Sequence, residues 1–290
     1  MILVSTIING LATGMAVFIV ATGLTLVLGV LKVLNFAHGA FFMIGAYIAF
    51  TLLGDDSATL SRLIGASLVS GVAVGVLGLL TDRVIFRRLR DVDPHFMLIA
   101  TFALLMVCAG VTKLIWGVDF HSVLPPEILA GMTAFGPVAL PTYSLFVILV
   151  GASLFVLLEF VFAQLWIGKV VKTVALDPWM AQLCGVRVAR VFSGAVVFSF
   201  FLAGFAGAVL LPNQSLSPSL ADTYLLQGFI VVIIGGFGNI RGAFIASVLL
   251  GLIDSINTLA LPTYPGIAVY FAMIASLLWR PEGLLNRVRA

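Results

Sequence analysis

Long apolar runs separated by short polar connections are the feature that most constrains how this chain can fold. The runs cover residues 6–31, 33–53, 61–81, 96–116, 143–166, 191–211, 224–238, 242–260 and 266–280. A helix of about 20 apolar residues spans the hydrocarbon core of a bilayer. Because hydrocarbon offers backbone N–H and C=O groups no partners, spanning runs must satisfy them internally, as helices do. The sequence therefore predicts an all-α, polytopic transmembrane bundle of about eight or nine spans, with discontinuous helices, forming one domain over residues 1–290.

The distribution of Lys and Arg predicts the orientation of these spans. All of the 15 Lys and Arg residues except Arg62 and Lys113 fall on one side of the alternating topology. They are Lys32, Arg83, Arg87, Arg88, Arg90, Lys169, Lys172, Arg187, Arg190, Arg241, Arg280, Arg287 and Arg289. Loops that hold Lys and Arg stay cytoplasmic. We therefore expect a multi-pass protein of the bacterial cytoplasmic (inner) membrane, with its N-terminus outside and its C-terminus inside.

The composition excludes several classes of protein. Charged residues make up 9% of the chain, whereas a soluble domain has about 25%. The net charge of +3 suits an anionic inner leaflet, and there is no basic and aromatic patch of the kind that binds nucleic acid. Cys108 and Cys184 suggest neither a disulfide nor a metal site. The N-terminus lacks the basic segment of a cleavable signal peptide.

Three connections are long enough to carry structure of their own. Residues 82–95 are short and basic, which predicts an internal loop, and residues 117–142 hold no Lys or Arg, which predicts an external one. Residues 167–190 form the longest internal segment. Within it, Asp177-Pro178 is typical of a helix start, and Gly185 suits a helix stop. The pattern predicts a short cytoplasmic helix near 177–185, and a loop that lies on the lipid is the alternative.

Two breaks interrupt the apolar pattern in a similar way. The segments 29–41 and 235–244 each follow an inward run and place Asn, then Gly-Ala-Phe, after a glycine-bearing stretch. This is a hint of a parallel internal repeat, and chance similarity is the alternative. Glycines permit broken helices that line a path for a polar solute. The candidate path or gating residues are Asn35, His38, Gly39, Gly235, Gly236, Gly238, Asn239 and Gly242.

Interhelical hydrogen bonding and close packing through small residues are the competing interpretation of these polar and glycine positions. We favour that interpretation for His38. Glu159, Asp254 and Lys113 are further ionisable residues within or near spans. Asp254 is the better candidate for a function, although a bond to another helix would also account for it. The sequence contains no motif of a hydrolase, metalloenzyme or nucleotide-binding loop, so we expect no enzyme activity and no cofactor.

Several segments carry a family resemblance. Residues 23–47 (GLTLVLGVLKVLNFAHGAFFMIGAY) resemble the N-terminal signature of the branched-chain amino acid ABC-transporter permeases, in their first (LivH) type. Residues 234–254 (IGGFGNIRGAFIASVLLGLID) resemble the second signature of that family, residues 175–212 resemble its cytoplasmic loop and following span, and residues 279–285 (WRPEGLL) resemble its closing motif. The resemblance covers most of the chain.

The resemblance implies a subunit of an ATP-driven importer. Its partners would be a companion permease of the second type, two cytoplasmic ATPase subunits, a periplasmic or extracellular solute-binding protein, and membrane lipid. In this family a short cytoplasmic helix docks into the ATPase, and the residues at that position here are Asp177, Trp179, Met180, Ala181, Leu183 and Gly185. The implied solute is a branched-chain amino acid, another amino acid, an amide or urea. A self-contained secondary transporter or channel is the alternative, and an intramembrane enzyme would need clustered catalytic groups.

Overall fold

The computed structural model describes residues 2–54, 59–90, 92–135, 138–264, 266–279 and 283. The C-terminal basic cluster (Arg280, Arg287 and Arg289) and the motif that follows Trp279 lie outside the described residues, apart from Gly283. In the described part, six helices are long and apolar enough to cross a membrane, and three shorter apolar helices accompany them. The predicted helical membrane bundle is therefore confirmed.

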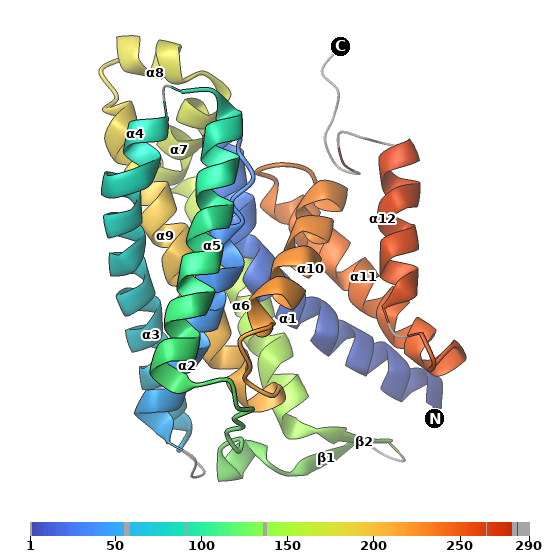
Figure 1. The fold of residues 1–290 in the computed structure, drawn as a ribbon. Coiled ribbons are helices and arrows are strands. Elements are labelled where there is room, and N and C mark those ends of the chain that lie inside the picture. Colours follow the sequence, from blue (N-terminus) through green and yellow to red (C-terminus); the bar gives the residue numbers. More distant parts are fainter. Residues whose placement is uncertain are drawn as a thin grey trace.

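The apolar runs form the principal helices of the bundle (Figure 1). These are α1 (Ile2–Leu31), α2 (Ala37–Leu53), α3 (Leu60–Thr81), α5 (Pro94–Trp116), α6 (Thr142–Gln164), α9 (Val188–Leu210), α10 (Leu220–Gly235), α11 (Ile240–Ala260) and α12 (Ile267–Trp279). The helices α2, α10 and α12 are the short ones, with 17, 16 and 13 residues. At a rise of about 1.5 Å per residue, each is shorter than the hydrocarbon core, which is about 30 Å thick.

The remaining elements lie at the two ends of the bundle. They are α4 (Arg87–Leu89), α7 (Trp166–Leu176), α8 (Pro178–Leu183), the strands β1 (Met132–Phe135) and β2 (Val138–Pro141), and the 3-10 turns Glu127–Leu129 and Leu211–Asn213. Figure 1 shows α4, α7 and α8 at one end, which we call the basic end, and β1 and β2 at the other, which we call the hairpin end. The described connections that hold the Lys and Arg clusters all lie at the basic end.

The connection expected over residues 82–95 is mostly helical. After α3 the chain continues through a π-helical turn, Asp82–Phe86, into α4, and α5 begins at Pro94. Asp93 caps α5, because its side chain accepts a hydrogen bond from the His95 N–H at 3.0 Å. That backbone hydrogen bond also lowers the pKa of the Asp93 carboxyl. A basic loop was the wrong description, since Asp and Pro are a helix start here as well.

Two other segments differ from the sequence-based expectation. The stretch 117–142 contains an antiparallel hairpin, in which Met132 pairs with Pro141 and Phe135 with Val138. The apolar run that was expected to end at residue 166 ends at Gln164, and residues 166–176 form the separate helix α7. Leu165 interrupts the two helices with an extended backbone, at ψ 146°. Composition alone does not show such a change of direction, because both sides of Leu165 are apolar.

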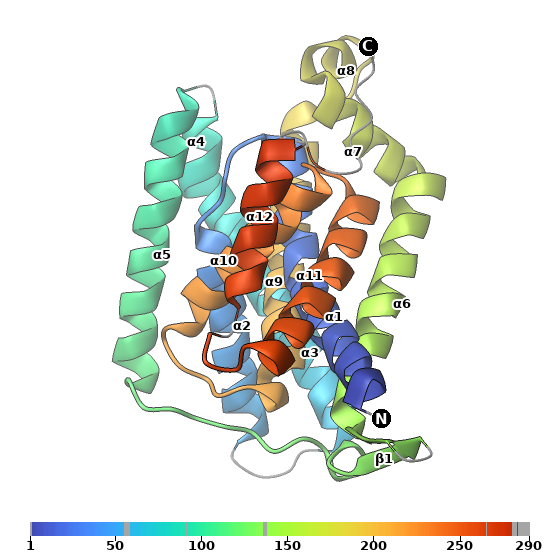
Figure 2. The ribbon, with the colours of Figure 1, turned by 90° about the vertical axis from the view of Figure 1, so that its right-hand side faces the viewer.

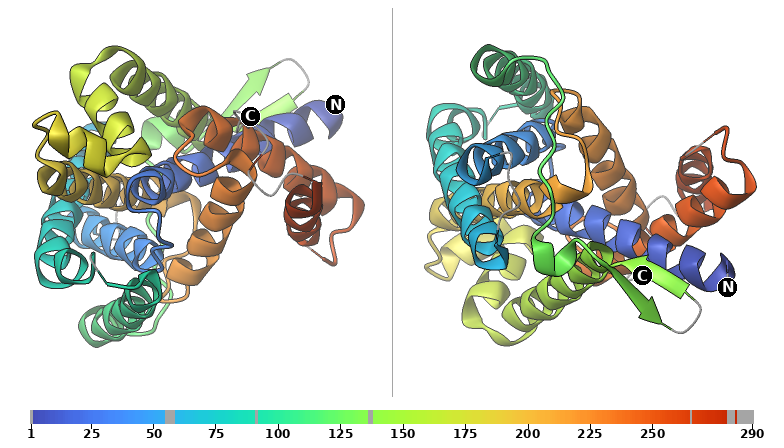
Figure 3. Two further views of the ribbon diagram at one scale, coloured as in Figure 1. Left: turned by 90° about the horizontal axis from the view of Figure 1, so that it is seen from above. Right: turned by 90° about the horizontal axis from the view of Figure 1, so that it is seen from below.

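Helix α1 lies at the centre of the bundle and is buried along most of its length. It packs against α6, α9, α10 and α11, and Figure 3 shows it among these helices when the bundle is seen along its axis. Gly14 of α1 faces Ser247 and Val248 of α11 so closely that a side chain would meet their backbone. Helices in a membrane associate through such small residues, because close backbone approach increases van der Waals contact.

Helix α12 lies at the periphery of the bundle (Figures 2 and 3). None of its described residues is buried, and its contacts are made with α10 and α11. Helices α10 and α11 run in opposite directions and meet at the basic end, where residues 236–239 join them. The region 224–260 therefore consists of two separate helices, of which α11 is long enough to span and α10 is not.

Candidate functional site

The short helix α8 has the start and the stop that the sequence predicts. The Asp177 side chain accepts a hydrogen bond from the Met180 N–H at 2.9 Å, and Pro178 occupies the first helical position. At the other end, the N–H of Val186 donates to the Ala181 carbonyl at 3.1 Å, and Gly185 has φ +81°. A positive φ at this place costs glycine little and most other residues considerably more. A short helix therefore forms at the place that the sequence suggests.

Helix α8 lies at the outermost part of the basic end (Figure 2), and several of its apolar side chains are exposed. Trp179 is 66% exposed, Leu183 63%, Met180 50% and the preceding Leu176 82%. We call these residues the apolar tip. Ala181 is fully buried, so it packs α8 onto the protein and is not available as a surface contact. Exposed apolar residues that gather beyond the ends of the spans are typical of a protein–protein interface.

Helix α7, which the sequence reading missed, carries α8 outward from the end of α6. Gly168 and Val174 of α7 are buried, while Trp166 and Ile167 at the start of the helix are exposed. Gly168 lies so close to Val161 and Phe162 of α6 that a side chain would meet their backbone. The spacing of Val171, Val174 and Ala175 is the helical signal that could have revealed α7.

A buried ionic cluster ties the start of α9, just after α8, to the end of α3. Asp82 is 1% exposed, and Arg90 Nη2 lies 2.9 Å from its Oδ1. Ser193 of α9 donates a hydrogen bond to the other carboxylate oxygen. The Arg90 guanidinium also lies 4.7 Å from the ring centre of Phe192, a distance that suits a cation–π contact. We call Asp82, Arg90, Phe192 and Ser193 the Asp82 cluster.

The two glycine-bearing breaks meet at the basic end. A side chain at Gly29, near the end of α1, would lie 2.5 Å from the Cα of Gly238, in the connection between α10 and α11. Gly235 and Gly242 likewise face each other across that connection, backbone against backbone. The Asn239 side chain caps α11 by accepting a hydrogen bond from the Gly242 N–H at 3.0 Å. The connection is therefore held by backbone contacts that only glycine allows.

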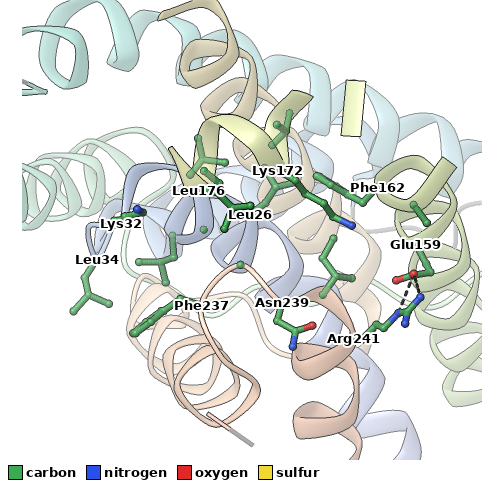
Figure 4. A pocket seen from close by; sticks show the side chains of 18 residues that line it. Leu26, Lys32, Leu34, Glu159, Phe162, Lys172, Leu176, Phe237, Asn239 and Arg241 are labelled. Atoms are coloured by element: carbon green, nitrogen blue, oxygen red, sulfur yellow. Dashed lines mark hydrogen bonds and ion pairs between the residues drawn. The ribbon is translucent and has the colours of Figure 1, made fainter. Parts of the chain in front are cut away.

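A cavity of about 900 Å³ opens beside this connection. It lies between the end of α1, the ends of α6 and α7, and the start of α11, as Figure 4 shows. Lys32, Lys172 and Arg241 supply cations to its wall, and Glu159 supplies a carboxylate. Arg241 Nε donates to Glu159 Oε1 at 2.9 Å, which joins α11 to α6. Of the predicted path residues, Gly238 and Asn239 line this cavity.

The predicted path residues of the first glycine-bearing break lie elsewhere. Asn35, His38 and Gly39 are buried in the packed core and do not line this cavity. Asn35 Oδ1 accepts a hydrogen bond from the Ala37 N–H at 3.1 Å, so it helps to start α2. His38 Nε2 lies 3.2 Å from the Val20 carbonyl of α1. Gly39 is packed against Ala221 of α10.

Replacing His38 by glutamine is expected to keep most transport activity, because glutamine also donates a hydrogen bond and can reach toward the Val20 carbonyl. His38→Leu removes the donor and is expected to lower the free energy of unfolding by about 1 kcal/mol. Uptake assays and thermal unfolding of the purified variants measure the two effects. A loss of uptake in His38→Gln, with unchanged unfolding, would show that the imidazole itself takes part in transport.

The described residues contain no group of three or more His, Cys, Asp or Glu side chains that could hold a metal ion. Cys108 and Cys184 are both free thiols. The described residues offer helix packing, an apolar tip and a basic cavity.

Comparison with known proteins gives consistent matches over nearly the whole chain. The family model described as the permease component of the branched-chain amino acid transport system matches residues 6–278. The chain is 27% identical to the high-affinity branched-chain amino acid permease protein BraD of Pseudomonas aeruginosa over 301 residues, covering 97% of this chain and 95% of that protein.

Two Escherichia coli proteins are also similar. The permease LivH is 26% identical over 293 residues, with 96% of this chain and 94% of that protein covered. The permease LivM is 27% identical over 302 residues, with 95% of this chain and 69% of that protein covered. No solved structure gives a significant match.

Proposed function

The chain belongs to the branched-chain amino acid transport permease family and is a multi-pass membrane permease of an ATP-driven importer, and we propose that it carries branched-chain amino acids or a related small polar solute. Other amino acids, amides and urea are the related solutes. ATP hydrolysis belongs to separate subunits, and this chain is not an enzyme. The relatives are permease subunits of amino acid transport systems by their names, which is the support for an amino acid as the solute.

The apolar tip is the observation that carries the proposed coupling to ATP hydrolysis. Trp179, Met180 and Leu183 dock on an ATPase subunit, and they do so from a helix too short to fold alone. Asp177 and Gly185 fix the two ends of that helix, and Ala181 fixes its inner face. Aromatic, Met and Leu side chains that are exposed in the free chain lose water on docking, which is how a small contact gains binding energy.

The proposed orientation puts the basic end in the cytoplasm. Loops that hold Lys and Arg resist translocation. Docking of the apolar tip on an ATPase subunit also requires the tip to lie in the cytoplasm, where ATP is available. The N-terminus and the hairpin β1–β2 then face outward, toward a solute-binding protein. The companion permease is of the LivM type, because this chain covers 94% of LivH and 69% of LivM and so corresponds in length to the LivH type.

Cysteine labelling tests the orientation. In a background without Cys108 and Cys184, single cysteines at Ile128 and Ser215, both exposed at the hairpin end, are expected to react with an impermeant maleimide in intact cells. Cysteines at Arg88 and Gln182, exposed at the basic end, are expected to react after permeabilisation and not before. Labelling of Arg88 or Gln182 in sealed cells would reverse the proposed orientation.

The cavity beside Gly238 and Asn239 forms the inner part of the proposed route. Its wall combines cations, a carboxylate and glycine-dependent backbone contacts at the cytoplasmic end. The contacts Gly29–Gly238 and Gly235–Gly242 allow the two breaks to shift against each other with little change in side-chain packing. Gly236, with φ +93°, ends α10 at the same place.

A further inference from the structure

A second, smaller cavity of about 280 Å³ lies between α1, α10, α11 and the loop and helix that follow. Its polar wall consists of Thr13, Gln227 and Asp254, and Tyr270 stands at its edge. Val17, Ile230 and Leu250 are among its apolar walls. The cavity shares no lining residue with the basic cavity and contains none of the residues assigned to the route above.

Asp254 is incompletely paired within the described chain. Its Oδ1 atom is buried and accepts no hydrogen bond from any described residue. Asp254 itself lines the wall of the cavity. No Lys, Arg or His lines the cavity among the described residues. A carboxylate at membrane depth is costly without a cationic or hydrogen-bonding partner, so a cationic group that enters this cavity would be stabilised beside Asp254.

The depth of Asp254 indicates where such a partner arrives. Asp254 lies on α11 about 9 Å along the helix axis from Ala260, at the hairpin end. This position is in the half of the membrane that faces the hairpin end, which is the outer half in the proposed orientation. A group that binds here meets the permease early in its passage inward.

We propose that this cavity is a transient site for a small aliphatic amino acid, with the Asp254 carboxylate accepting a hydrogen bond from the solute ammonium group. The assignment rests on the proposed function and deepens it, because it separates zwitterionic amino acids from neutral amides and urea. Gln227 and Thr13 supply donors for the solute carboxylate. Val17, Ile230 and Leu250 supply apolar surface for an aliphatic side chain.

The chemistry of the wall fits this class of solute and not the others. Urea and short amides bear no charge, so they would leave the Asp254 carboxylate without a cation. A carbohydrate would face mainly aliphatic walls with few hydrogen-bonding groups. A single carboxylate within an apolar surround also favours weak binding, because the solute must be desolvated to enter, and weak binding suits a site from which the solute moves on.

Protection of an introduced thiol tests the site directly. Tyr270 is exposed at the edge of the cavity, and Tyr270→Cys in a Cys108→Ser, Cys184→Ser background gives one reactive thiol. The transporter is reconstituted with its companion permease, and the rate of modification by a small methanethiosulfonate reagent is measured with leucine or with 4-methylpentanoate, which lacks the ammonium group. Leucine is expected to slow modification, and 4-methylpentanoate is not.

The variant Asp254→Asn keeps the shape of the side chain and removes its charge. We expect leucine to protect about 10- to 100-fold less well in this variant, which is the effect of losing one hydrogen bond to a charged group. Asp254→Glu is expected to retain part of the protection. Asp222→Asn, an exposed carboxylate in the first turn of α10 outside the cavity, is the matched control and should change nothing.

Each outcome decides one question. Equal protection by leucine in Asp254→Asn, or protection by 4-methylpentanoate as strong as by leucine, overturns the ammonium site. Loss of the companion permease from the purified Asp254→Asn complex would overturn it too, because Asp254 would then pair with a cation of that subunit. If the complete wild-type assembly takes up leucine and leucine does not protect, the site is wrong and the proposed function stands. If that assembly takes up no amino acid, the proposed solute itself is wrong.

Discussion

Replacing Trp179 and Leu183 together by aspartate is expected to abolish ATP-driven uptake while the permease remains folded in the membrane. Both side chains are more than half exposed in this chain, so their loss removes little packing within it. In the assembled importer they would be covered by the ATPase, and two unpaired carboxylates would be left in an apolar contact. A loss of about 2 kcal/mol at each site corresponds to nearly a thousandfold weaker docking in total.

The measurements for this variant are uptake in cells and co-purification of the ATPase. Met132→Asp is a matched control, because Met132 is a similarly exposed apolar residue, 72% accessible, in the hairpin at the opposite end. We expect the control to keep both uptake and the ATPase. Retention of the ATPase and of uptake in the Trp179→Asp, Leu183→Asp variant would remove the docking role from α8.

The second large effect is expected at the Asp82 cluster. Asp82→Asn leaves the Arg90 guanidinium facing a neutral amide at the buried junction of α3 and α9. Removing one partner of a buried ion pair costs about 3 to 5 kcal/mol, and we expect about 3 kcal/mol because the Arg90 side chain is 16% exposed. The loss in unfolding free energy is measured by denaturation of the purified protein in detergent. Uptake should fall as well, since Ser193 anchors the helix that follows the apolar tip.

Arg88→Gln serves as the control for Asp82→Asn. Arg88 is exposed on the same basic connection, and substitutions at such positions change stability by less than about 0.5 kcal/mol. An Asp82→Asn variant as stable as Arg88→Gln would show that the buried pair contributes nothing net to the fold. It would also leave the attachment of the apolar tip without its proposed support.

The helices of this protein could be predicted because a bilayer enforces their length and their composition. The two ends of α8 could also be predicted from the sequence. Asp177 and Pro178 are favoured at the start of a helix, and Gly185 is favoured just after its end. The boundary between α6 and α7 at Leu165 could not be predicted from the sequence. Both helices are apolar there, and only the change of direction separates them. The hairpin was missed because strands of four residues leave too short a pattern.

The polar residues within the spans have different roles, and only their three-dimensional contacts show which role each one has. Asn35 and Asn239 occupy similar places after glycine-bearing stretches, yet Asn35 starts a helix inside the core and Asn239 lines a cavity. Glu159 of α6 accepts a hydrogen bond from Arg241 of α11. Such pairings join residues 82 positions apart, and no local pattern in a single sequence specifies them.

Uptake by the reconstituted importer tests the central claim most directly. The permease and its companion are placed in liposomes with the binding protein outside, with or without the ATPase subunits, and labelled leucine is added with ATP inside. We predict accumulation of leucine that requires both ATP and the ATPase subunits, and that is lost in the Trp179→Asp, Leu183→Asp variant. Accumulation by the two permeases alone, driven by an ion gradient, would contradict the account and identify a self-contained carrier.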